Sequence, residues 1–264
     1  VIAELVELTA RREGIGELIA EGAYNMARRL AKRGIKEALK YCYHIKGVGC
    51  DLELSEIGIL LHATSTRGAD ELRGHVVASV TPYNVEWNRR LEERGDLPRD
   101  PVEKAIWGQR VFTLADMLQR CKIGFHTWPA AHPLVYAHPL FHGPALILRA
   151  VTGEDFTRKS LIEAVDRVYS LERSILVRRG VKRKHDYPPR EVFRRSRIAK
   201  GTFERMLKRY YELRGWDWDS GAPKKEVLAE LGLRDVAETL YEDGLKRDWS
   251  NTHLGGESSE STET

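Results

Sequence analysis

The chain has 264 residues, of which 42% are hydrophobic and 31% charged, a composition typical of a water-soluble globular protein. No apolar run approaches the ~18 residues needed to span a bilayer, and the three scattered cysteines exclude a disulfide framework, so we expect a cytoplasmic protein. The net charge of +4 is unevenly distributed, because residues 172–209 contain fourteen lysines and arginines against four acidic residues.

The N-terminal part of the chain has helical periodicity. We expect one helix over 1–12, a second over 16–33 with Gly22 inside it, and a short third over 35–45. The amphipathic pattern begins at once, with no capping residue before it, which favours a natural N-terminus upstream of Val1.

The rest of the chain is also predicted to be helical. An apolar run at Ile57–Leu61 leads into a Thr-Ser-Thr-Arg-Gly turn. Further helices are expected over 69–79, 82–94, 101–121, 157–179, 201–214, 223–232 and 234–248. Only "VVASV" (76–80) has strand character, so the sequence predicts an all-α fold. The last fifteen residues, 250–264, are polar and of low complexity, and we expect a disordered tail.

Several enzyme classes are excluded by missing motifs. The sequence has no phosphate-binding G-x-x-x-x-G-K-[ST], no dinucleotide-binding G-x-G-x-x-G after a strand, no H-E-x-x-H and no G-x-S-x-G. P-loop, Rossmann, zincin and α/β-hydrolase interpretations are therefore not supported.

Two other features permit a functional interpretation. Four histidines interleaved with proline and aromatic residues lie close after Cys121, but their spacing matches no standard zinc site, and we expect surface or cleft-lining side chains. These histidines are His126, His132, His138 and His142. The basic stretch 178–200 could follow a phosphate backbone or bind an acidic protein, yet it contains no recognised nucleic-acid module, so nucleic acid is not the favoured partner.

Asp116 and Cys121 form the remaining candidate, in "DMLQRCK" (116–122). A thiolate is a soft ligand for iron, and one cysteine can complete a cluster whose other ligands lie elsewhere. By itself the spacing is weak evidence, because a single cysteine is most often a small core residue.

An ordered set of stretches strengthens this interpretation. They are "REGIGELIAEG" (12–22), "HIKG" (44–47), "HATSTRGADELRG" (62–74), "DMLQRCK" (116–122), "YSLERSILVRRGVKRKHDYPPR" (169–190) and "YYELRGWDWDSGAPKKEVLAELGL" (210–233). Together they resemble the aldehyde ferredoxin oxidoreductase family, whose members bind tungsten or molybdenum through a bis-pterin cofactor. The resemblance covers nearly the whole chain except the tail.

The resemblance implies roles for individual residues. Cys121 would be the last ligand of a 4Fe–4S cluster, and Asp116 would bond a pterin, with Lys122 following as is common in the family. Arg120, Lys122 and Arg67 would also contact the cofactor.

The resemblance also implies a catalytic pair and an internal loop. Asp70 and Glu71 stand near the position of a histidine proposed to move protons at the metal, and a carboxylate that keeps its proton near neutral pH could do the same work. The loop "RRGVKRKHDYPPR" would be internal, with Arg183 and Asp186 paired to neighbours, rather than a surface that steers ferredoxin.

The chain departs from the family pattern at several positions. Gln119 stands where the family usually has glycine, and Arg120 where it usually has a small apolar residue. The Pro-Arg-Gly usually found before the Thr-Ser turn is replaced by "LELSE" (52–56). Bulk at Gln119 and Arg120 could crowd a pterin, or Arg120 could pair with its phosphate.

The resemblance implies a domain organisation as well. Residues 1–47 would end a middle helical domain and 48–249 would form the C-terminal helical domain. The family's N-terminal β domain and the other three cluster cysteines would precede Val1, while Cys42 and Cys50 would be structural.

The implied function is oxidation of an aldehyde, or another oxo substrate, to a carboxylic acid, with electrons leaving through the cluster to ferredoxin. The partners implied are ferredoxin and the missing N-terminal portion, and a homodimer is left open. Two alternatives remain at this stage: a basic all-helical binding module, and a scaffold subunit that has lost the cofactor.

Overall fold

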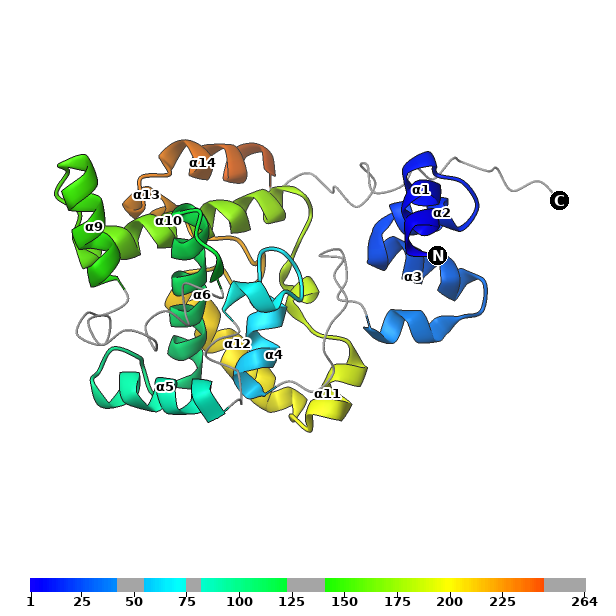
Figure 1. Ribbon diagram of the computed structural model, residues 1–264, viewed down its shortest axis with the longest axis horizontal. Helices are drawn as coiled ribbons and strands as arrows, with labels where there is room; N and C mark the ends of the chain where they lie inside the picture. The colour runs from blue at the N-terminus through cyan, green and yellow to red at the C-terminus, as the bar shows by residue number, and fades with distance from the viewer. Residues whose placement is uncertain (42–54, 75–81, 123–140, 245–264) are drawn as a thin grey trace.

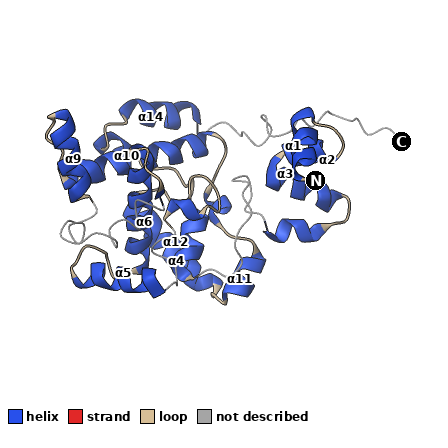
Figure 2. Ribbon diagram, in the orientation of Figure 1, coloured by secondary structure: helices blue, strands red, loops and turns tan. Residues whose placement is uncertain are grey.

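The computed structural model describes residues 1–41, 55–74, 82–122 and 141–244 (Figure 1). Helices dominate these ranges, and no β-strand occurs within them (Figure 2). The one β-bridge among the described residues joins Trp216 and Pro223. The all-α prediction is thus confirmed, and "VVASV" lies outside the described residues. None of the helices in these ranges combines the length and apolar character that crossing a bilayer requires.

The N-terminal helices form a separate lobe (Figure 1). They are α1 (Ile2–Arg11), α2 (Ile15–Ala20), α3 (Gly22–Lys32) and the 3-10 helix η1 (Lys36–Tyr41). The predicted single helix over 16–33 is wrong, because Gly22 adopts a φ of +80° and divides it into α2 and α3. Helix α1 buries no side chain. The lobe meets the rest of the chain where η1 contacts α11 (Arg190–Ser196).

Four helices pack together at the centre of the larger body (Figure 1). They are α4 (Glu56–Thr64), α6 (Pro101–Met117), α10 (Arg158–Arg178) and α12 (Lys200–Arg214). Three start at side-chain caps, which satisfy first-turn N–H groups: Ser55 caps α4, Asp100 caps α6 and Thr157 caps α10. Their buried faces share one hydrophobic cluster.

Shorter elements surround these four helices. They are the 3-10 helix η2 (Glu71–Arg73), α5 (Pro82–Glu93), α9 (His142–Thr152), the 3-10 helix η4 (Arg183–Asp186), α11, α13 (Lys225–Glu230), α14 (Arg234–Thr239) and the π-helical turn η5 (Leu240–Gly244). The sequence missed α9 and α11. Of the predicted helix over 69–79, the described part contains only η2, which ends before Gly74 with its φ of +124°, and residues 75–79 lie outside the described residues.

The end of α6 also differs from the prediction. The helix stops at Met117, and Gln119 adopts a left-handed backbone with a φ of +53°. The N–H of Arg120 then donates to the carbonyl of Ala115 and the N–H of Gln119 to that of Asp116. Cys121 therefore follows the helix end instead of lying on the helix, as the expected helix over 101–121 would require.

The loop after α10 has the paired Asp186 that the sequence interpretation favoured, although its Lys182 and Lys184 are exposed. Asp186 and Arg173 are fully buried and form a bidentate ion pair with N–O distances of 3.0 and 2.7 Å. The Arg173 guanidinium also donates to the Gly221 carbonyl and stacks over the Trp216 ring. Arg183 stacks over the Trp218 ring, at 4.4 Å from its centroid.

Candidate functional site

Asp116 lies in the last turn of α6, with its side chain 40% exposed. Its Oδ2 lies 2.9 Å from Lys122 Nζ and 3.5 Å from Arg73 Nη1. Lys122 is buried and also donates to the Leu72 carbonyl at 2.7 Å. The left-handed turn at Gln119 thus folds Lys122 back toward Asp116. Lys122 and Arg73 both meet the Oδ2 atom of Asp116, and part of the carboxylate remains exposed to solvent.

The Thr-Ser-Thr-Arg-Gly turn lies beside this helix end. Burial lowers the pKa of Lys122, and the nearby positive charges of Arg67 and Arg73 lower it further, whereas Asp116 opposes the shift. Arg67 comes from the turn itself, so the charges of the turn and of the α6 terminus act on each other.

The two proposed proton carriers differ in what the structure describes. Asp70 forms an ion pair with Arg67 at 2.5 Å and accepts the Leu72 N–H at 2.8 Å. To transfer a proton it would first have to leave this pair. Glu71 opens η2, and its side chain lies outside the described part of the molecule.

Sequence reasoning missed three members of this site. Arg73 is 4% exposed, and its Nη2 donates to Oε1 of Glu172 on α10. The other carboxylate oxygen of Glu172 accepts a hydrogen bond from the Thr66 hydroxyl at 2.7 Å. Arg73 and Thr66 lie in "HATSTRGADELRG" and Glu172 in "YSLERS", stretches that carried the resemblance. Their sequence context thus marked them, although it assigned them no role. We call Thr66, Arg67, Arg73, Asp116, Lys122 and Glu172 the α6-terminal cluster.

Cys121 lies one residue before Lys122, forms no disulfide and has an exposed side chain. Arg120 and Gln119 are also exposed, so the two bulky departures from the family pattern lie at the surface. No three metal-binding side chains gather within the ranges that the structure describes. One accessible cysteine and one accessible carboxylate fit a cluster and a pterin that are mostly held by residues from elsewhere. The buried Nε of Arg73, which has no hydrogen-bond partner among the described residues, fits the same incomplete site.

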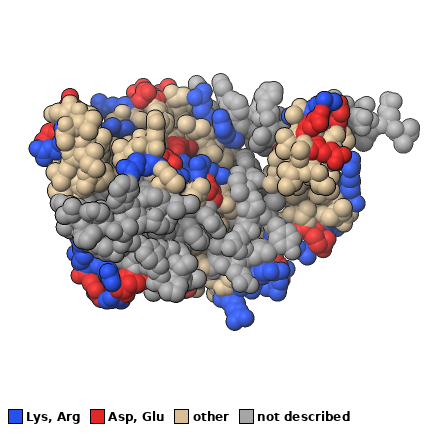
Figure 3. Space-filling view, viewed as in Figure 1, with Lys and Arg blue, Asp and Glu red and all other residues tan. Residues whose placement is uncertain are grey.

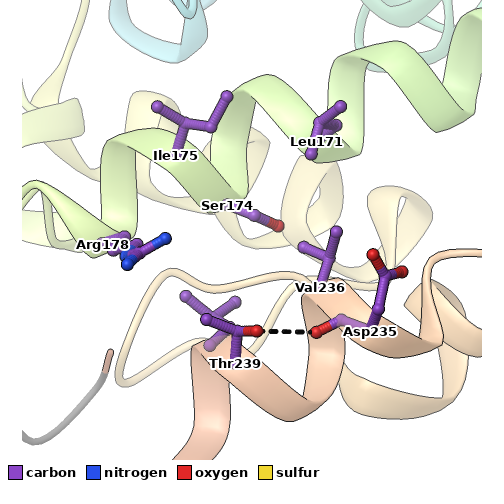
Figure 4. A pocket seen from close by; sticks show the side chains of 8 residues that line it. Leu171, Ser174, Ile175, Arg178, Asp235, Val236 and Thr239 are labelled. Carbon is purple, nitrogen blue, oxygen red and sulfur yellow. Dashed lines mark hydrogen bonds between the residues drawn. The ribbon is translucent and has the colours of Figure 1, made fainter. Parts of the chain in front are cut away.

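A surface pocket is present elsewhere, between α10 and α14 (Figure 4). Its volume is about 250 Å³, and its lining includes Leu171, Ile175, Arg178 and Val236. None of its lining residues belongs to the α6-terminal cluster, so the pocket does not mark the candidate site.

The remaining sequence candidates are placed as follows. Lys and Arg side chains gather over α11 at the lower edge of Figure 3, where Arg194 and Arg195 both pair with Glu191. His142 is exposed at the start of α9. The other three histidines, with Cys42 and Cys50, lie outside the described residues.

Comparison with known proteins agrees with this helical fold. Residues 1–233 match the family model described as aldehyde ferredoxin oxidoreductase, domains 2 & 3. The chain therefore belongs to the aldehyde ferredoxin oxidoreductase family, as its second and third domains.

Particular relatives define the likeness further. The chain is 25% identical over 242 residues to the tungsten-containing aldehyde ferredoxin oxidoreductase of Pyrococcus furiosus, covering 89% of this chain and 37% of that protein. It is 27% identical over 253 residues to the aliphatic sulfonate oxidoreductase, WOR-like subunit, of the same organism, covering 89% of this chain and 35% of the relative. The chain thus spans little more than a third of either relative.

A solved structure has a similar fold. The active-site complex BamBC of benzoyl coenzyme A reductase, bound to 1,5-dienoyl-CoA, matches 91% of this chain and 40% of its own with a TM-score of 0.68. At 20% sequence identity this likeness concerns the fold alone.

Proposed function

We propose that this chain is the C-terminal part of an oxidoreductase that converts an aldehyde to a carboxylic acid at a tungsten or molybdenum bis-pterin centre. Its electrons would pass through a 4Fe–4S cluster to ferredoxin. The observation that carries the proposal is the end of α6, where the exposed carboxylate of Asp116 and the exposed thiol of Cys121 are five positions apart. Family membership makes this geometry meaningful, because either side chain alone would be unremarkable at a protein surface.

The reaction balances with water as the oxygen source. An aldehyde and water give a carboxylic acid, two protons and two electrons, and two ferredoxins each accept one electron. The metallopterin supplies the oxygen transfer and accepts the electron pair when bound. The protein must hold it, exclude competing reactions and remove the protons.

The residues of this chain would divide the binding work. The solvent-facing side of the Asp116 carboxylate can accept N–H groups from a pterin ring, as charge-assisted hydrogen bonds. The Cys121 thiolate would bind one iron of the cluster. Because five positions separate them around a tight turn, the cluster and the pterin would lie next to each other, which suits electron transfer. Arg67 and Arg120 would meet the pterin's anionic groups, and Asp70 or Glu71 would carry protons.

The substrate class rests on the family and is the finer part of the proposal. The sulfonate oxidoreductase subunit matches this chain about as well as the aldehyde enzyme does, at 27% and 25% identity. An oxo substrate other than a simple aldehyde is therefore a second candidate, which an assay with both substrates would separate.

The proposed domains also depend on residues outside this chain. Within residues 1–40, whose burial is described, the N-terminal lobe buries only Gly16 and Ala27, while Ile2 is 80% and Val6 64% exposed. An amphipathic helix with an uncovered apolar face usually packs against a partner. We propose that 1–47 is the end of a middle domain whose core is completed elsewhere, and that 48–249 is the C-terminal domain; the boundary and the proposed tail, 250–264, lie outside the described residues.

The test compares this chain alone with the full-length protein. The isolated chain should bind neither a stable cluster nor the pterin and should not oxidise aldehydes, because one cysteine cannot hold four irons. In the full-length protein, Cys121→Ser should abolish the cluster absorbance. Asp116→Ala should reduce the pterin content while leaving the iron content nearly unchanged.

Met117→Ala is the matched control, since Met117 is exposed in the same helical turn and has no proposed role. A complete cluster in the isolated chain, or an unaltered one in full-length Cys121→Ser, would contradict the assignment. A full-length protein without cofactor would favour the scaffold-subunit alternative.

A further inference from the structure

Glu172 connects three parts of the chain that meet at the α6-terminal cluster. It projects from α10, and its Oε1 lies 2.5 Å from Arg73 Nη2 while its Oε2 accepts the Thr66 hydroxyl at 2.7 Å. Arg73 belongs to η2, and Thr66 to the turn after α4. Both carboxylate oxygens are thus engaged, one by each segment.

Arg73 passes this constraint on to Asp116. The guanidinium is planar, so fixing Nη2 on Glu172 also sets the direction of Nη1. Nη1 lies 3.5 Å from Asp116 Oδ2 and 3.4 Å from the Thr113 hydroxyl. Since Arg73 is only 4% exposed, surrounding atoms restrict its other orientations.

The charges support the same arrangement. Without Glu172, Arg73 and Lys122 would both have Asp116 as their only described acidic partner. Arg73 would then be free to turn toward Asp116 and compete with an incoming ligand for its carboxylate oxygens. Glu172 balances the charge of Arg73. It thereby keeps Arg73 at 3.5 Å from Asp116, farther away than Lys122 at 2.9 Å.

We propose that Glu172 is a positioning residue that, through Arg73, sets the Asp116 carboxylate for pterin binding. The inference rests on the proposed function, since it requires that Asp116 binds the pterin. Glu172 does not contact the ligand in this scheme, and Thr66 fixes the second oxygen of its carboxylate.

A double-mutant cycle in the full-length holoenzyme tests this scheme. The measured quantity is the rate at which pterin is released, followed by the fluorescence of the oxidised pterin. Glu172→Gln keeps the side-chain volume but removes the charge, and should speed release about tenfold, the effect of weakening one charged hydrogen bond. In an Asp116→Ala background, Glu172→Gln should alter the release rate less than about twofold. The reason is that Glu172 acts on the pterin only through the Asp116 carboxylate, which this background lacks.

Two further variants test the other bond of Glu172. Thr66→Val removes the hydroxyl and should speed release by a smaller factor than Glu172→Gln, whereas Thr66→Ser keeps the hydroxyl and should restore slow release. Glu163→Gln is the control on the same helix, because Glu163 is exposed and pairs only with Lys159 among the described residues. It should leave the release rate unchanged.

The outcomes separate the two levels of the proposal. Equal acceleration by Glu172→Gln in both backgrounds would show a merely structural role and overturn the inference. Unchanged release in Glu172→Gln, with fast release in Asp116→Ala, would overturn the inference and leave the role of Asp116 intact. Unchanged release in Asp116→Ala would overturn both. If Glu172→Gln does not fold, the Thr66→Val and Thr66→Ser pair decides by the same comparison in the Asp116→Ala background.

Discussion

Two charged clusters in the larger body are built from the same residue types but differ in solvent exposure. We call the Arg173 cluster closed, because its ion pair is fully buried, and the α6-terminal cluster open, because its Asp116 carboxylate is exposed. Around Arg173, one guanidinium meets Asp186, the Gly221 carbonyl and the Tyr211 hydroxyl, and both charged side chains have no solvent exposure. At the end of α6, Arg73 is also buried, at 4% exposed, yet its two carboxylate partners, Asp116 and Glu172, are 40% and 30% exposed.

The difference fits a structural role for the Arg173 cluster and the proposed binding role for the α6-terminal cluster. The Arg173 cluster satisfies its own hydrogen-bonding groups and has no capacity left for a ligand. The α6-terminal cluster retains an accessible carboxylate and has an exposed thiol, Cys121, beside it. Charged residues alone would not distinguish the two, whereas the accessibility of the acceptor does.

The largest expected effect is on the closed cluster. Asp186→Asn leaves the buried Arg173 charge without a counter-ion, so we expect a loss of about 3–5 kcal/mol in the free energy of unfolding. Denaturant unfolding of the chain measures it. By contrast, Asp116→Ala at the open cluster should cost less, about 1–2 kcal/mol, because Asp116 is partly solvated, although the buried Lys122 loses its carboxylate partner.

The control for the first prediction is Glu163→Gln, in an exposed pair with Lys159, which should change stability by no more than about 0.5 kcal/mol. If Asp116→Ala destabilised the chain as much as Asp186→Asn, the contrast between a structural and a binding cluster would fail.

A second prediction adds bulk to the closed cluster. Gly221 has a φ of +75°, and a Cβ there would lie 2.7 Å from Arg173 Nη2 and 2.9 Å from the backbone nitrogen of Arg183. Gly221→Ala should therefore cost about 2–3 kcal/mol through backbone strain and displacement of the ion pair. Gly153→Ala is the matched control, since its φ of +78° is similar but nothing lies within 4 Å of its Cβ. It should cost only about 1 kcal/mol, and equal losses at the two glycines would show that the cluster is not tightly packed.

Sequence periodicity predicted the all-α class and most of the long helices. The central helices have apolar faces that one chain can bury, so pattern and fold agree. Gly22 was misjudged because a helical glycine and a helix-breaking one look alike in sequence, and only the φ of +80° distinguishes them. Helix α9 was missed because Gly143 and Pro144 in its first turn resemble a loop, and α11 because seven residues provide little periodic signal.

The candidate site was predicted only in part. Asp116, Cys121 and Lys122 were found because they are close in sequence and match a family motif. Glu172 lies 99 positions from Arg73 and 106 from Thr66, so its two bonds depend on the tertiary packing of α10. Local pattern contains no information about such pairs. The same limit concealed the Arg173 partners at Tyr211 and Gly221.

A third prediction concerns the backbone of the open cluster. Gln119 adopts a φ of +53°, a conformation that costs a residue with a side chain about 1 kcal/mol relative to glycine, which explains why the family usually has glycine there. Gln119→Gly should raise the free energy of unfolding by about 0.5–1 kcal/mol, measured by chemical denaturation. Met117→Gly, inside the last helical turn, should lower it by about 1 kcal/mol. Destabilisation by Gln119→Gly would mean that the Gln119 side chain makes a contact that holds the open cluster together.

The smallest expected effect belongs to a third charged group, on α11, in which Glu191 is 17% exposed but its two cationic partners, Arg194 and Arg195, are 67% and 41% exposed. Hydrogen bonds from Arg194 and then Arg195 outweigh the opposing effect of burial and lower the pKa of Glu191 to about 2, from an ordinary value near 4.5. Because the folded-state pKa is the lower one, the stabilisation is present above about 4.5 and is lost as the pH falls toward 2. A carbon-detected NMR titration of the Glu191 carboxyl should show this low midpoint, and Arg194→Ala should raise it toward the ordinary value. Thermal stability at neutral pH should hardly change in Arg194→Ala, since solvent screens exposed pairs. A large loss there would mean that solvent exposure does not rank the contributions of these charged groups.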